Sequence, residues 1–122
     1  MQRKPSKKTR GANAAEKRHM AWAKEQPCIV CMHPGPSIAH HCWGATEKKK
    51  VNLVTVLIGH WAVMPLCERC DSVVTNRSRR GFENLYGRQI DHLLRHLDGY
   101  PGKDEIPEDV MDAFDETYAS VY

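Results

Sequence analysis

This sequence lacks a long hydrophobic run. The longest, Val51 to Gly59, contains Asn52 and Thr55 and is far too short to cross a bilayer, so we expect no membrane segment and no membrane partner. The chain also opens on polar and basic residues, where an export signal would place an apolar stretch. Together these absences predict a protein of the reducing cytoplasm.

The cysteines do not form an even set, which argues against a disulfide framework. Four of the five form two Cys-x-x-Cys pairs, Cys28 with Cys31 and Cys67 with Cys70. Such a spacing lets a turn present both thiolates to one tetrahedral ion, and four sulfur ligands favour zinc and leave no open position. Because a chain of 122 residues buries little apolar surface, we predict one structural zinc that stabilises it. A redox-active pair or plain buried cysteines are the alternatives, and Cys42 is expected to be a small buried hydrophobe.

The net charge of +3 conceals a gradient along the chain. Residues 1–25 carry eight Lys/Arg against two acids, whereas residues 101–122 carry one lysine against seven acids. A basic arm beside a mildly basic core is typical of proteins that bind the phosphate backbone, so DNA is the expected partner. We divide the chain into a disordered basic arm (1–18), a zinc-binding domain (19–100) and an acidic helical segment (101–122). A merely solubilising terminus is the alternative for the arm.

Hydrophobic periodicity predicts a small α+β domain. The capping and apolar patterns predict helices over 14–24, 78–99 (with Ser78 as N-cap) and 107–122, and one or two helical turns after Cys70. Strands are expected over 37–43 and within 51–66, where Gly59 marks a break, and the basic segment 45–50 is expected to be a loop.

The adjacent histidines His40 and His41 lie between the two cysteine pairs. A zinc ion would bring their strand beside the start of the helix that carries Asp71, so two imidazoles and a carboxylate could converge there. Adjacent strand residues point to opposite faces, so both histidines serve one ion only if the strand ends or bulges at that point. A structural histidine pair, and an Asp71 that only caps its helix, are the alternatives.

The segments PCIVC, AHH and GHWAVMPLCERCD resemble in order and spacing the HNH nucleases with the ββα-metal (His-Me finger) fold, and among them the phage recombination-enhancement nucleases. The resemblance covers about residues 26–87. The resemblance implies a zinc-stapled ββα-metal core with additional helices, and a metal-dependent DNA endonuclease of phage or mobile-element recombination, acting in a bacterial host with a possible recombinase partner. It implies His41 as general base and His40 as a ligand of a catalytic Mg²⁺ or another divalent ion. The last catalytic position, usually histidine, is Asp71 here, which is a competent Mg²⁺ ligand. His60 matches a histidine of these relatives that would orient or contact the scissile phosphate; otherwise it is a turn residue.

Hydrolysis of a phosphodiester requires a base near neutral pH and a cation that neutralises charge on the phosphate and on the departing 3′ oxygen. Basic side chains near the proposed site in the sequence could hold the DNA backbone, or could form only a solvated surface: Lys48, Lys49, Lys50, Arg77, Arg79 and Arg80. Trp43 and Trp61 could stack on bases or pack in the core. A zinc-dependent nucleic-acid-binding or adaptor protein without catalysis is the alternative function, and a zinc-knuckle regulator of transcription or translation is a third.

Overall fold

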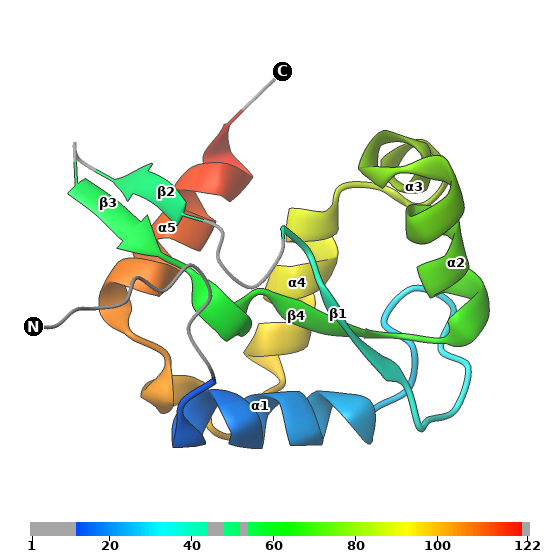
Figure 1. Ribbon diagram of the computed structural model, residues 1–122, viewed down its shortest axis with the longest axis horizontal. Coiled ribbons are helices and arrows are strands. Elements are labelled where there is room, and N and C mark those ends of the chain that lie inside the picture. The colour runs from blue at the N-terminus through cyan, green and yellow to red at the C-terminus, as the bar shows by residue number, and fades with distance from the viewer. Residues whose placement is uncertain (1–11, 44–47, 52–53, 121–122) are drawn as a thin grey trace, which may run out of the picture.

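The computed structural model describes residues 12–43, 48–51 and 54–120, with the side chains of 48–51, 54, 76 and 77 excepted. Within these residues the chain forms five α-helices, two short 3₁₀-helices and two antiparallel strand pairs (Figure 1). The predicted α+β class is confirmed. No helix of the described residues combines the length and the apolar character needed to cross a membrane.

The helices and strands follow one another in this order, with η marking a 3₁₀-helix: α1 (Ala14–Lys24), β1 (Ile38–His41), β2 (Lys48–Val51), β3 (Val54–Leu57), η1 (Gly59–Trp61), β4 (Val63–Leu66), α2 (Glu68–Arg77), α3 (Arg79–Tyr86), α4 (Gln89–Asp98), η2 (Lys103–Glu105) and α5 (Glu108–Ala119).

The strand pair that matters for the site joins β1 to β4. The two strands run antiparallel, with Ile38 opposite Leu66 and His41 opposite Val63. Helix α1 contacts both strands, and α4 contacts β4 (Figure 1). Every residue of β4 is buried. This explains why β4 reads as a continuous apolar run, because a strand covered on both faces has no solvent side that would require polar residues.

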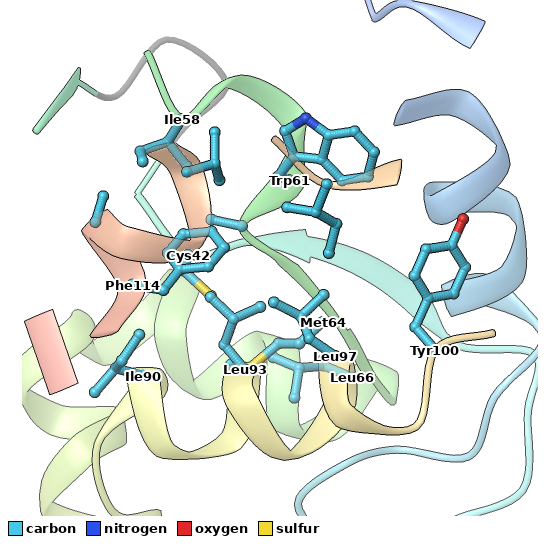
Figure 2. Close-up of a cluster of buried hydrophobic side chains, with 14 of the residues drawn as sticks. Cys42, Ile58, Trp61, Met64, Leu66, Ile90, Leu93, Leu97, Tyr100 and Phe114 are labelled. Atoms are coloured by element: carbon cyan, nitrogen blue, oxygen red, sulfur yellow. The ribbon is translucent and has the colours of Figure 1, made fainter. Parts of the chain in front are cut away.

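The hydrophobic core lies between β4, α4 and α5. Met64, Leu93 and Phe114 are fully buried and come from these three elements (Figure 2). Cys42 is 7% exposed and belongs to the same cluster, which confirms its prediction as a small buried hydrophobe. Trp61 is 3% exposed, so core packing is confirmed for it and base stacking is wrong.

Helix α1 begins within the segment that was predicted to be a disordered basic arm. The helix spans Ala14–Lys24 as expected, but the predicted arm reached residue 18 and therefore overlapped it. Asn13 and Glu16 form a capping box, in which the Asn13 side chain accepts from the Glu16 N–H and the Glu16 carboxylate accepts from the Asn13 N–H. Glu16 is fully buried, so the order of the chain begins before residue 18. Residues 1–11 of the arm lie outside the described residues.

The helix predicted over 78–99 is two helices, α3 and α4. Gly87 separates them with φ of +96°, a left-handed conformation that glycine adopts without the penalty of a Cβ. Ser78 does cap α3, because its side chain accepts from the N–H of Gly81. The predicted loop over 45–50 is also wrong in part, since Lys48–Lys50 lie in β2; residues 45–47 are outside the described residues.

Candidate functional site

The two Cys-x-x-Cys pairs converge as predicted. The sulfur atoms of Cys28, Cys31, Cys67 and Cys70 all lie within 4.8 Å of one another, and those of Cys31 and Cys67 are 3.6 Å apart. Ligands about 2.3 Å from a tetrahedral zinc ion are separated by about 3.8 Å. The four cysteines could therefore hold a zinc ion with little movement.

The first pair lies on a tight turn and the second at the start of α2. The N–H of Met32 donates to the carbonyl of Cys28, which closes the turn, and Cys67 is the N-cap of α2. A hydrogen bond from the backbone of His33 is the main reason that the pKa of Cys31 falls to about 7, which favours the thiolate that binds metal. Burial raises the pKa of Cys70, so a metal ion that binds there displaces a proton.

His40 lies between α2 and the first residue of α4. Its Nδ1 is 3.3 Å from Oδ1 of Asp71, and its Nε2 is 2.8 Å from Oε1 of Gln89. The structure thus brings His40 and Asp71 together, as expected for two ligands of one ion. The capping alternative for Asp71 is wrong, because the N-cap of α2 is Cys67 and Asp71 lies within the helix.

His41 has a different neighbour from His40. Its Nε2 is 3.0 Å from Nδ1 of His60 in η1, and the backbone N–H of His60 donates to Oε2 of Glu16. Burial chiefly lowers the pKa of His41, followed by the nearby His60 and His40, against an opposing effect of Glu16. Burial and the two neighbouring imidazoles thus favour the neutral form of His41. The two imidazoles meet different partners, since consecutive strand residues point to opposite faces.

The atoms His40 Nδ1 and Asp71 Oδ1 suit a hard divalent cation. Two adjacent ligand atoms of an octahedral ion, each about 2.1 Å from it, lie about 3.0 Å from each other, so the observed 3.3 Å would need only a small closure. In the described part of the chain, the four cysteines form the one group of three or more His, Cys, Asp or Glu side chains that could hold a metal. An ion at His40 and Asp71 would thus depend on water and substrate oxygens for its other ligands, as Mg²⁺ commonly does.

A family model described as "Protein of unknown function (DUF968)" matches residues 3–100, which include both cysteine pairs and all the histidines of this region. The chain belongs to the DUF968 family. No curated protein and no solved structure matches it. The family description names no activity.

The predicted DNA-binding side chains are described only in part. Arg79 and Arg80 are exposed at the start of α3. The side chains of Lys48, Lys49, Lys50 and Arg77 are outside the described ones. One pocket of about 290 Å³ combines an aromatic ring with arginines: it is lined by Trp43, Arg79, Glu83, Arg88, Ile90, Thr117 and Ser120.

Two residues of the site were not found from the sequence of this DUF968 protein. Gln89 is 1% exposed and contacts His40, and Glu16 is fully buried and contacts the backbone of His60. The Asn13–Glu16 spacing of a capping box was a usable signal for Glu16. Gln89 had no such signal, because the predicted helix ran through Gly87 and so hid the helix start at which Gln89 stands.

Proposed function

We propose that this DUF968 protein is a metal-dependent DNA endonuclease of the HNH type, which hydrolyses phosphodiester bonds and carries a structural zinc ion on its four cysteines. The observation that carries the proposal is the 3.3 Å distance between His40 Nδ1 and Asp71 Oδ1. The next residue of the same strand, His41, contacts His60. A carboxylate and imidazoles in this arrangement supply both a cation site and a base.

The local architecture supports the finer fold that we propose, a ββα-metal core. Strands β1 and β4 are antiparallel, α2 follows β4 after Cys67, and α2 contacts both strands. The proposed cation ligands come from the first strand and from the helix of this unit. The cysteine cluster lies at the junction of β4 and α2, so a zinc ion there would fix the position of Asp71 relative to β1.

In the proposed reaction, His40 and Asp71 would hold a divalent ion near the scissile phosphate. The ion, when bound, would neutralise charge on the phosphate and on the departing 3′ oxygen. His41 donates its Nε2–H to Nδ1 of His60 and accepts a proton from the attacking water at its own Nδ1. Glu16 fixes the backbone of His60, and His60 in turn orients the ring of His41.

The DNA substrate is held, in this proposal, by the basic arm and by the arginines at the start of α3. Phosphate contacts from such residues position the backbone without reading sequence. A role in phage or mobile-element recombination, with a recombinase as a further partner, follows from the resemblance described above and forms part of the proposal.

Nicking of supercoiled plasmid by zinc-loaded protein tests the proposal. Wild-type protein is expected to nick DNA when Mg²⁺ is added, and His41→Ala is expected to lose about 10²–10⁴-fold in rate, the usual contribution of a general base. The variant should keep its zinc and its DNA affinity. His33→Ala is the matched control, because the His33 imidazole is exposed and only the backbone of this residue, which the substitution keeps, contributes to the cysteine turn.

A wild-type protein that binds DNA in a zinc-dependent way and never nicks it would overturn the proposal. That result would favour the alternative, a zinc-dependent nucleic-acid-binding or adaptor protein. Nicking that His41→Ala leaves unchanged would instead show that the assigned base is wrong.

A further inference from the structure

Gln89 is a buried polar residue that contacts the proposed cation ligand His40. It is 1% exposed, it opens α4, and its backbone N–H donates to a carboxylate oxygen of Glu83. Burial of a primary amide is unfavourable unless its polar atoms are paired. Both ends of this amide have partners, and one of them is His40.

The neighbours of Gln89 fix which way its amide points. Its nitrogen lies 3.4 Å from the carbonyl oxygen of Cys42, which can only accept a hydrogen bond. The amide oxygen therefore faces His40 and lies 2.8 Å from Nε2 of that ring. The reverse orientation would place two oxygens against each other at Cys42, so it is disfavoured.

The orientation of the amide in turn fixes the tautomer of His40. An amide oxygen can only accept, so His40 must carry its hydrogen on Nε2 and donate it to Gln89. In the neutral ring Nδ1 then has a lone pair and no hydrogen. That lone pair is on the atom 3.3 Å from the Asp71 carboxylate. With a neutral His40, two electron-rich atoms face each other there, an arrangement that a proton on Nδ1 or a metal cation between the two atoms would stabilise.

We propose that Gln89 is a positioning residue for a divalent cation: it holds His40 in the Nε2–H tautomer, so that Nδ1 is available to share the ion with Asp71. The inference rests on the cation site of the proposed function and adds the residue that prepares it. Histidine ligands of metals commonly donate their other N–H in this way, and removal of the acceptor typically costs 10–100-fold in metal affinity.

The test measures binding of Mn²⁺ alone to the zinc-loaded full chain, by titration calorimetry, and reads the His40 tautomer from long-range ¹H–¹⁵N NMR correlations. Gln89→Met removes both amide contacts at similar length, and it is expected to weaken Mn²⁺ binding about 10–100-fold and to abolish the single Nε2–H tautomer. Gln89→Glu retains an acceptor for His40 and should therefore keep the Nε2–H tautomer; because it loses the donor to the Cys42 carbonyl, only its NMR readout is compared with wild type.

Ile90→Val is the matched structural control. Ile90 is the next residue of α4, it is 4% exposed, and shortening it loosens the same helix without touching His40. Its Mn²⁺ affinity should equal that of wild type. Asp71→Ala identifies the binding event, because it should abolish the binding that Gln89→Met weakens.

Equal Mn²⁺ affinities in wild type and Gln89→Met, no Mn²⁺ binding to wild type, or a wild-type His40 with hydrogen on Nδ1 would each overturn the inference. Neither readout uses DNA cleavage. A chain that never nicks plasmid but binds Mn²⁺ in a Gln89-dependent way supports the inference and defeats the nuclease proposal. A protein that nicks plasmid, and whose Mn²⁺ affinity does not depend on Gln89, supports the nuclease proposal and overturns the inference.

Discussion

A buried histidine pair should make the stability of this protein strongly dependent on pH. His19 of α1 and His96 of α4 meet with their Nε2 atoms 3.0 Å apart, and the two residues are 0% and 4% exposed. Burial, the main cause in both cases, lowers the pKa of His19 to about 4 and that of His96 to about 3. Aromatic rings of Trp61 and Tyr100 pack beside His19 and keep water away from it.

The magnitude follows from the difference between folded and unfolded pKa values. An unfolded histidine titrates near 6.5, so below that pH the unfolded chain binds protons that the folded pair does not accept. The stability from this pair is thus fully present above pH ~6.5 and is lost as pH falls toward the folded values. Between pH 7.5 and pH 5, each histidine should lower the free energy of unfolding by about 2 kcal/mol. The pair together removes about 4 kcal/mol, a large part of the roughly 5–15 kcal/mol that is typical of a domain.

Urea unfolding at pH 7.5, 6 and 5 measures this effect. The double variant His19→Phe/His96→Leu replaces both polar partners by apolar groups, so neither is left without its partner. The stability difference between wild type and this variant should shift by about 4 kcal/mol over the pH range, while release of zinc affects both proteins alike. His33→Asn, which changes an exposed histidine, should follow wild type. Parallel profiles for wild type and the double variant would refute the reasoning.

Three further outcomes are expected. Protein purified without added zinc should contain about one zinc per chain by metal analysis, and its removal should unfold the domain; an undiminished helical circular dichroism signal after complete chelation would contradict this. Asp71→Ala should abolish Mg²⁺-dependent nicking but change thermal stability little, whereas a destabilised, fully active variant would show that Asp71 is structural. Residues 2–12 carry five Lys/Arg and precede the Asn13 cap, so their deletion should weaken the salt dependence of DNA binding. The slope of log K against log salt concentration should fall in magnitude by about 0.9 for each phosphate that the shortened chain no longer neutralises. An unchanged slope would exclude the arm from DNA binding.

Short-range patterns in the sequence predicted much of the local structure. Helix 14–24 and the strand around His40 were confirmed because capping residues and apolar period report the state of a segment directly. The convergence of the cysteine pairs was predictable for a similar reason, since two Cys-x-x-Cys pairs in one short chain are typical of a zinc site.

Features that depend on single backbone angles or on distant contacts were not predictable. The break at Gly87 depends on a positive φ that a strong apolar stripe conceals, and the burial of Glu16 depends on its meeting η1, 44 residues further along. The partners of His41 and His40 diverge because of strand alternation, but which groups they meet depends on how α4 and η1 pack. A pattern within one segment contains none of this information.

The close spacing of Cys70 and Asp71 has a practical consequence for biochemical assays. Cys70, a member of the cysteine cluster, and Asp71, whose carboxylate contacts His40, are consecutive residues of α2. Stripping the cluster would therefore displace the carboxylate as well. Inhibition by a strong chelator such as EDTA is expected even if no second ion takes part in chemistry. Any dependence of DNA nicking on a second ion is best measured by adding back Mg²⁺ or Mn²⁺ to protein whose zinc content is checked in the same sample.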